Sequence, residues 1–115
     1  MKDWADIQKK AIAFRDARDW KQFHNPKDIA LSLVLEATEV LEHFQWKNPE
    51  EVKAYGISHK DEIGEELADV AAYLFELADN LGVDLGEALE KKLKKNEERY
   101  SVEKAKGSAK KYNEY

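Results

Sequence analysis

The sequence predicts an all-α protein, and three observations support that class. Helix-forming residues such as Ala, Leu, Glu and Lys dominate the 115 residues, whereas only five glycines and two prolines are present. Apolar residues recur at helical spacing, and no stretch shows the alternation that is typical of a half-buried strand. Two Asn-Pro pairs mark helix starts. The length suits one compact domain, for which we expect a four-helix bundle-like protomer with a short extra helix.

The first two helices are expected on either side of a short loop. The first begins near Trp4 and fades near Trp20, with apolar residues spaced along one face. The second starts after Asn25, whose side chain is a good N-cap, with Pro26 at its first position, where a missing N–H costs nothing. Its pattern continues to about Trp46.

A short helix and the third main helix are expected next. The second Asn-Pro pair, at residues 48–49, predicts a short helix that ends at Gly56. The third main helix is expected over residues 59–80, with Ser58 as its N-terminal cap and Gly82 as its stop.

The last main helix is followed by a stretch of different composition. Asp84 and Glu87 have the residue types of a capping box, so we expect a helix that reaches about Tyr100. Residues 101–115 are polar and lysine-rich and show little apolar periodicity, which is typical of a mobile or ligand-ordered tail. The expected organisation is one domain over residues 1–100 and this tail.

Composition excludes several kinds of protein. The absence of cysteine excludes disulfides, thiol catalysis and cysteine-ligated zinc. We find neither a signal-type apolar core at the N-terminus nor an apolar run long enough to cross a bilayer, so a cytoplasmic protein without a membrane partner is expected. The net charge of −5 gives no general attraction to nucleic acid.

Charge is distributed unevenly along the chain. Residues 29–46 and residues 61–90 contain no lysine or arginine, although both stretches contain several acidic residues. The second and third main helices are also too apolar for surface helices of a small monomer. We therefore expect a homodimer or homotetramer that buries the excess apolar surface.

Two pairs of carboxylates lie on these two helices. Glu36 and Glu39 are three residues apart on one helix, and Glu66 and Asp69 have the same spacing on the other, so each pair shares a face. A single such pair is usually solvated surface. Two pairs facing each other between antiparallel apolar helices would repel strongly without a cation. Oxygen ligands favour Mg²⁺, or Mn²⁺ in its place, and the sequence thus predicts a metal site.

The residue types exclude other common sites. No Glu has a His three residues later, as di-iron bundles require, and the three histidines lack zinc-type spacing. We find no Gly-rich phosphate loop and no nucleophile elbow.

The two carboxylate pairs match the E-x-x-E and E-x-x-D halves of a known signature. With the surrounding stretches "RDWKQFHNPKDIALSLV", "EHFQWK", "EELADVAAYL" and "KKNEERY", the sequence resembles the all-α nucleotide pyrophosphohydrolases of the MazG-like superfamily, and most closely the dCTP pyrophosphatase branch. The resemblance covers roughly residues 4–100.

The resemblance implies hydrolysis of a dNTP to the monophosphate and pyrophosphate, and the expected substrate is dCTP or a modified pyrimidine dNTP. The implied biological role is house-cleaning of the nucleotide pool. It implies that Glu36, Glu39, Glu66 and Asp69 bind Mg²⁺, and Glu36 or Glu39 is expected also to accept the proton of the attacking water. It also implies a dimer or tetramer with sites near subunit contacts.

The resemblance also implies substrate-binding residues. Five residues match positions around the base and sugar: Trp20, Phe23, His24, Trp46 and Tyr73. Four match the segment that closes over the triphosphate: Lys92, Asn96, Arg99 and Tyr100. Spacing alone favours core packing for the aromatic residues and a solvated face for the lysines, and the resemblance shifts them toward the site.

The sequence departs from relatives at several positions. Leu35 and Thr38 replace glycines beside the first Glu pair, Ala11 replaces a histidine, and Ser101 replaces a proline after the last helix. These differences bear on base preference more than on reaction type. The alternative function is a non-catalytic helical module that binds a nucleotide or protein partner and mediates oligomerisation.

Overall fold

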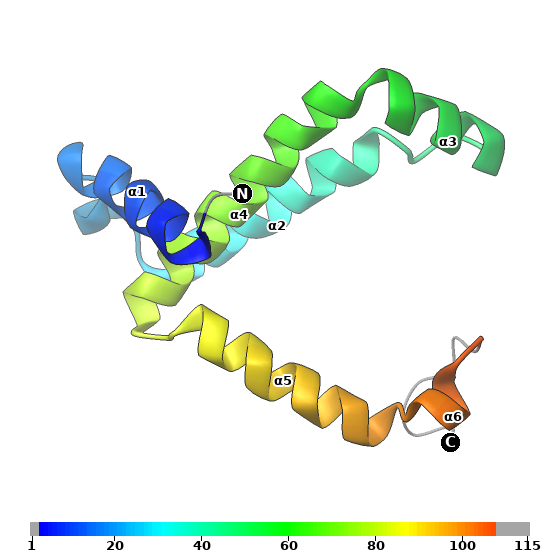
Figure 1. Cartoon of the computed structure of the whole chain (residues 1–115). Helices are drawn as coiled ribbons and strands as arrows, with labels where there is room; N and C mark the ends of the chain where they lie inside the picture. Colours follow the sequence, from blue (N-terminus) through cyan, green and yellow to red (C-terminus); the bar gives the residue numbers. More distant parts are fainter. Residues whose placement is uncertain (1–2, 108–115) are drawn as a thin grey trace. The chain divides into compact units, whose positions relative to one another are not determined.

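The structure is a computed structural model that describes residues 3–107, and this part of the chain is all-α, as predicted, with no strand. None of its helices is long and apolar enough to span a membrane. The chain divides into two compact units, residues 1–82 and residues 83–115, and each is described by itself. In chain order the elements (Figure 1) are α1 (Trp4–Ala17), the short 3-10 helix η1 (Lys21–Phe23), α2 (Pro26–Glu42), α3 (Pro49–Ser58), α4 (Lys60–Leu81), α5 (Leu85–Arg99) and α6 (Val102–Ala105).

The first unit is built around an antiparallel pair of helices. Figure 1 shows α2 and α4 running side by side in opposite directions, joined through α3, and both α1 and α3 pack against α4. The buried apolar core is small and comprises Ile29, Phe75 and Ala78. Trp4 extends it from α1, with its ring meeting Phe75 edge-on at 4.8 Å between centroids. The antiparallel arrangement sets the Glu pair of α2 opposite the acidic pair of α4.

Asparagine caps fix the starts of α2 and α3. Each Asn side chain accepts a hydrogen bond from the backbone N–H three residues later, and a proline occupies the first helical position, as the sequence predicts. The capping box lies at Asn48 and Glu51, at the start of α3. Gly82 ends α4 in the left-handed conformation with φ of 68°, which costs glycine little.

Three predicted helix boundaries are corrected. Helix α2 ends at Glu42, because hydrogen bonds over three residues tighten the chain after it and Pro49 disfavours helical backbone at Asn48. Helix α3 continues through Gly56 to Ser58. The Ser58 hydroxyl does not cap α4 but bonds the Tyr55 carbonyl oxygen within α3, at 3.3 Å.

The second unit contains α5 and the short α6. Asp84 caps α5 by accepting a hydrogen bond from the Glu87 N–H at 3.0 Å. Part of the predicted tail is helical, since α6 follows α5 after a break at Tyr100 and Ser101, and residues 108–115 lie outside the described range. Because the two units are described separately, the four-helix bundle and the domain boundary at residue 100 stay predictions.

Candidate active site

The structure brings the two predicted carboxylate pairs together between α2 and α4. The pKa of Glu36 is raised, first by burial, next by a hydrogen bond with the Glu39 side chain, and then by the negative charges of Glu39, Asp69 and Glu66. Each of the other three predicted ligands therefore lies close enough to oppose ionisation of Glu36. The spacing of three within each helix, and the antiparallel pairing of the helices, produce this cluster.

Two oxygen atoms of this carboxylate cluster are buried without a hydrogen bond. They are Oε2 of Glu36 and Oε2 of Glu66. An acceptor buried without a hydrogen bond has lost hydration, which is unfavourable unless a ligand or a neighbouring positive charge compensates for it. Within residues 3–107 no three acidic or histidine side chains stand close enough together to hold a metal ion. The donor set thus suits Mg²⁺ in its chemistry and its unused acceptors, although the side chains are not closed around an ion.

A histidine that the sequence analysis did not assign lies against this cluster. Nε2 of His43 lies 2.7 Å from Oε2 of Glu66, although the pair lacks the alignment of a hydrogen bond. Nδ1 of His43 is 2.9 Å from the Tyr55 hydroxyl, and the Tyr55 ring stacks on His59 with 3.9 Å between centroids. Glu42, His43 and Tyr55 line a cavity of about 160 Å³ with Glu39 and Glu66. The sequence signal for His43 is its position four residues after Glu39 on one helix face.

A second cavity, of about 210 Å³, adjoins the carboxylates through a shared residue, Asp69. We call it the aromatic cavity. Three of the predicted base-binding residues, Trp20, His24 and Tyr73, line it. Its remaining lining residues, none of which the sequence analysis assigned to the site, are Phe14, Ala72 and Glu76.

Trp46 is not brought into the aromatic cavity. Its side chain is 87% exposed and it does not line this cavity. Helix α2 ends four residues before it, so Trp46 stands in the turn that leads to α3. Its predicted role in base binding stays a prediction.

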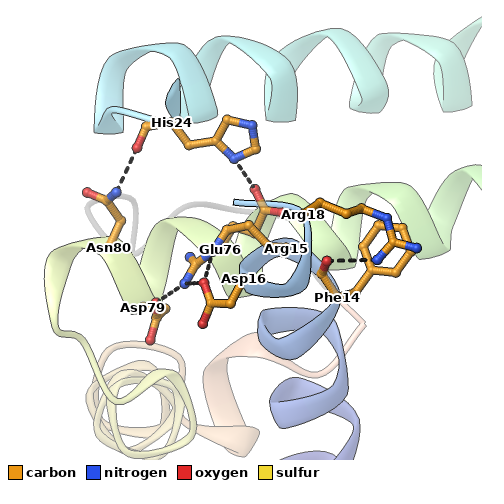
Figure 2. A network of polar contacts seen from close by, with 8 residues as sticks. All are labelled: Phe14, Arg15, Asp16, Arg18, His24, Glu76, Asp79 and Asn80. Atoms are coloured by element: carbon orange, nitrogen blue, oxygen red, sulfur yellow. Dashed lines mark hydrogen bonds and ion pairs between the residues drawn. The ribbon is translucent and has the colours of Figure 1, made fainter. Parts of the chain in front are cut away.

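The turn after α1 positions two of the cavity residues. Asp19 adopts a positive φ of 57°, a conformation in which Asp is enriched, and the Gln22 side chain bonds both its carbonyl and its carboxylate oxygen at 3.0 Å. The Asn80 side chain donates to the His24 carbonyl oxygen at 2.8 Å and fixes this turn to α4 (Figure 2).

A buried arginine in the last turn of α1 connects this helix to α4. Arg15 is 1% exposed, and its guanidinium bonds Asp16 at 2.9 Å and Asp79 at 2.8 Å (Figure 2). Burial lowers the pKa of Arg15, but the hydrogen bonds and charges of Asp79 and Asp16 outweigh burial and leave the pKa raised. Arg18 lies over the Phe14 ring, with 3.6 Å from its guanidinium carbon to the ring centroid.

The aromatic cavity is electrostatically negative on its α4 side. Glu76 is buried and lies on the same helix face as Tyr73 and Asp69. The pKa of Tyr73 is raised, first by burial and then by the charges of Glu36, Glu76 and Asp69, against a hydrogen bond with Ser32 that lowers it. The spacing of Asp69, Tyr73 and Glu76 along α4 could have indicated Glu76 from the sequence.

The predicted triphosphate-binding residues lie in the second unit. Lys92, Asn96 and Arg99 are on α5, and Tyr100 follows it, with its N–H bonded to the Asn96 carbonyl oxygen at 2.7 Å. Positions 92, 96 and 99 recur at helical spacing and share one face of α5. Their approach to the carboxylates of the first unit stays a prediction.

Comparisons with curated proteins give relatives of one kind. The dCTP pyrophosphatase 1 of Mus musculus is 41% identical over 109 residues, which is 93% of this chain and 64% of the relative. The dCTP pyrophosphatase 1 of Homo sapiens is 40% identical over 111 residues, covering 95% of this chain and 65% of the relative. The chain therefore spans slightly less than two thirds of the length of these relatives.

A solved structure and a family profile agree with these relatives. The crystal structure of a pyrophosphatase from Archaeoglobus fulgidus superposes with a TM-score of 0.79 at 37% identity, over 84% of this chain and 91% of that one. The profile of the MazG-like family matches residues 31–115, which include both carboxylate pairs. The chain belongs to the MazG-like family.

Proposed function

We propose that this protein is a Mg²⁺-dependent nucleoside triphosphate pyrophosphohydrolase that converts a pyrimidine dNTP, such as dCTP, to the monophosphate and pyrophosphate. One observation carries the proposal: the carboxylate cluster adjoins an aromatic cavity through Asp69, so a base site and a phosphate site can share one substrate. The relatives named dCTP pyrophosphatase support the choice of substrate.

The carboxylates have the role of holding the metal near the triphosphate. A triphosphate carries about four negative charges, so Glu36, Glu39, Glu66 and Asp69 would repel it without a counterion. Bound divalent ions supply charge neutralisation and activation of a water molecule, and Mn²⁺ is expected to replace Mg²⁺. Oε2 of Glu36, which is buried and accepts no hydrogen bond, is the atom best suited to coordinate, and Oε2 of Glu66 would coordinate beside His43.

The reaction is attack of water on the α-phosphorus, with cleavage of its bond to the oxygen that leaves with the β-phosphate. Glu36 or Glu39 accepts the proton of the attacking water. The aromatic cavity holds the base through Trp20, His24 and Tyr73. On α5, Lys92, Asn96, Arg99 and the following Tyr100 bind the phosphates, and the Arg99 guanidinium can form a two-pronged contact.

The test is a turnover assay with Mg²⁺ across the canonical dNTPs and modified pyrimidine dNTPs, with chromatographic identification of the products. Monophosphate plus pyrophosphate is the expected pair. Diphosphate plus phosphate would exclude attack at the α-phosphorus. Stabilisation of the protein by nucleotide without any turnover would instead support the non-catalytic binding module.

A further inference from the structure

Glu76 is a buried carboxyl group that no part of the proposed reaction uses. The residue is 8% exposed, and its Oε2 atom is buried and accepts no hydrogen bond. Nδ1 of His24 lies 3.2 Å from this oxygen, within ion-pair distance, and is likewise buried without a hydrogen bond (Figure 2). A buried acceptor and a buried ring nitrogen in one cavity wall have hydrogen-bonding capacity that the protein itself leaves unused.

The surroundings of Glu76 hold this pair in place. His24 is fixed through its carbonyl oxygen by Asn80, and one turn along α4 Asp79 bonds the buried Arg15 (Figure 2). The first contact joins α4 to the segment that carries His24, and the second joins α4 to α1. A polar pair that is already held in place binds a ligand with a smaller free-energy cost of reorganisation.

The rest of the cavity wall favours a flat aromatic ligand. Phe14, Trp20 and Tyr73 line the same cavity as Glu76 and His24. Aromatic side chains bind planar rings by stacking. The volume of about 210 Å³ lies below the usual range for a complete ligand site, so the cavity suits one ring system with the sugar and phosphates outside it.

We propose that Glu76 determines base specificity by accepting a hydrogen bond from the exocyclic amino group of the base, so that the aromatic cavity takes cytosine in preference to uracil or thymine. This inference rests on the proposed function. A carboxylate accepts only, and the 4-amino group of cytosine donates. His24 then donates to the adjacent ring nitrogen of cytosine. A 4-keto group in the same place would face the carboxylate oxygen acceptor to acceptor and leave both unsatisfied.

The experiment measures base binding apart from hydrolysis. Titrations of dCMP and dUMP are followed by tryptophan fluorescence, since Trp20 lines the cavity. These ligands differ only in the amino or keto group and the adjacent ring nitrogen. The proteins compared are the wild type, Glu76→Gln, and Glu50→Gln as a matched control, because Glu50 is exposed on α3 and does not line the cavity.

The wild type and Glu50→Gln are expected to bind dCMP at least about tenfold more tightly than dUMP, the effect of roughly one hydrogen bond. Glu76→Gln is expected to remove most of that ratio, because an amide can donate to the keto group. A wild type without preference, or an unchanged ratio in a folded Glu76→Gln, overturns the proposal. A Glu76-dependent preference for dAMP or dGMP over dCMP overturns the assignment to cytosine.

A second variant and a parallel turnover measurement complete the binding experiment. If Glu76→Gln does not fold, Glu76→Asp withdraws the carboxylate by one methylene, and the same loss of ratio is expected. Turnover of the nucleoside triphosphates by the wild type is measured in parallel. Preferential dCMP binding by the wild type without turnover would contradict the proposed reaction and retain the role of Glu76. Turnover by the wild type, together with the same dCMP-to-dUMP affinity ratio in Glu76→Gln, would support the reaction and contradict the role of Glu76.

Discussion

Glu36, a predicted metal ligand, lowers the stability of the metal-free protein when it is charged. Its carboxyl lies among three other acidic side chains, one of its oxygens is buried without a partner, and its pKa is raised from the ordinary value of 4.5. A raised pKa in the folded state means that the uncharged form fits the fold better than the charged form. The contribution of Glu36 to stability is therefore fully present below pH 4.5 and is lost as the pH rises through its folded pKa.

Glu36→Gln is accordingly expected to raise the melting temperature of the metal-free protein at neutral pH, because an uncharged amide replaces the opposed charge. The gain shrinks as the pH is lowered through the folded pKa of Glu36 and is absent well below pH 4.5, where Glu36 is uncharged in both states. The same variant is expected to lose the stabilisation that Mg²⁺ gives the wild type. Thermal melts at several pH values, with and without Mg²⁺, measure both effects. A variant less stable than the wild type at neutral pH would contradict this role.

The sequence predicts residues that share a helix face, and from them the carboxylate pairs that meet across α2 and α4, but not the contacts made at helix ends and turns. Glu36 and Glu39 follow from a spacing of three on a helix without a countercharge. The contact of His43 with Glu66 depends on how the end of α2 meets α4, and that of Glu76 with His24 on the turn at Asp19. Neither arrangement has a fixed sequence separation, so periodicity cannot reveal it.

Among the elements, α1 is attached to α4 by a buried ion pair. Arg15 is fully buried, whereas the side chains of its partners Asp16 and Asp79 are 52% and 35% exposed. Partial exposure of the carboxylates weakens each pair relative to a fully buried one. The guanidinium still binds both carboxylates with one fork-shaped group, which a lysine cannot reproduce.

Arg15→Met is expected to lower the free energy of unfolding by about 2 kcal/mol, because it removes the hydrogen bonds and keeps most of the apolar stem. Arg15→Lys is expected to recover only part of the loss. Urea denaturation followed by circular dichroism measures both variants, and Lys10→Met serves as the control, since Lys10 is exposed on the same helix. Equal stability of the Arg15 variants and the control would show that this ion pair does not hold α1.

The junction of α2, α3 and α4 places His43 between Tyr55 and a predicted metal ligand, Glu66. Side chains behind a ligand orient it, and their removal commonly weakens metal binding by 10- to 100-fold. His43→Leu is therefore expected to weaken Mn²⁺ binding by about tenfold, measured by titration with paramagnetic resonance detection. Tyr55→Phe is expected to have a smaller effect in the same direction. Wild-type Mn²⁺ affinity in folded His43→Leu would contradict a positioning role.

The elements themselves were largely predictable because their ends have local signals. Asn25 and Asn48, each followed by proline, begin α2 and α3 as expected, and Gly82 ends α4. The predicted end of α2 is wrong, because the apolar pattern continues to Trp46 although the helix ends at Glu42, ahead of Pro49. The predicted cap of α4 is wrong because the Ser58 hydroxyl bonds a carbonyl oxygen within α3. Tertiary and steric effects decide these boundaries, and local pattern does not report them.

The whole molecule exposes more large apolar side chains than a small monomer usually does. On α2 alone four of them are between 55% and 60% exposed: Leu31, Val34, Leu35 and Leu41. They recur at helical spacing and include the neighbour of Glu36. We propose that a second copy of the chain covers this face, so that the carboxylate cluster lies beside a subunit contact.

The assembly prediction is a dimer or tetramer at micromolar concentration, measured by sedimentation velocity. Val34→Lys places a charge at the centre of the exposed face and is expected to weaken association by at least about tenfold. Lys53→Glu on α3, an exposed position outside this face, is the control. A wild-type protein that sediments as a monomer at every concentration would contradict the assembly.

We propose that the carboxylates of α2 and α4 form one divalent-metal site for triphosphate hydrolysis. The most direct measurement is pyrophosphate release from dCTP as a function of Mg²⁺ concentration, in the wild type, Glu39→Gln, Asp69→Asn and the control Glu50→Gln. The wild type and Glu50→Gln are expected to show the same saturable Mg²⁺ dependence. Turnover is expected to be abolished in the other two variants, which remain folded by circular dichroism. Full activity in either Glu39→Gln or Asp69→Asn would contradict the site.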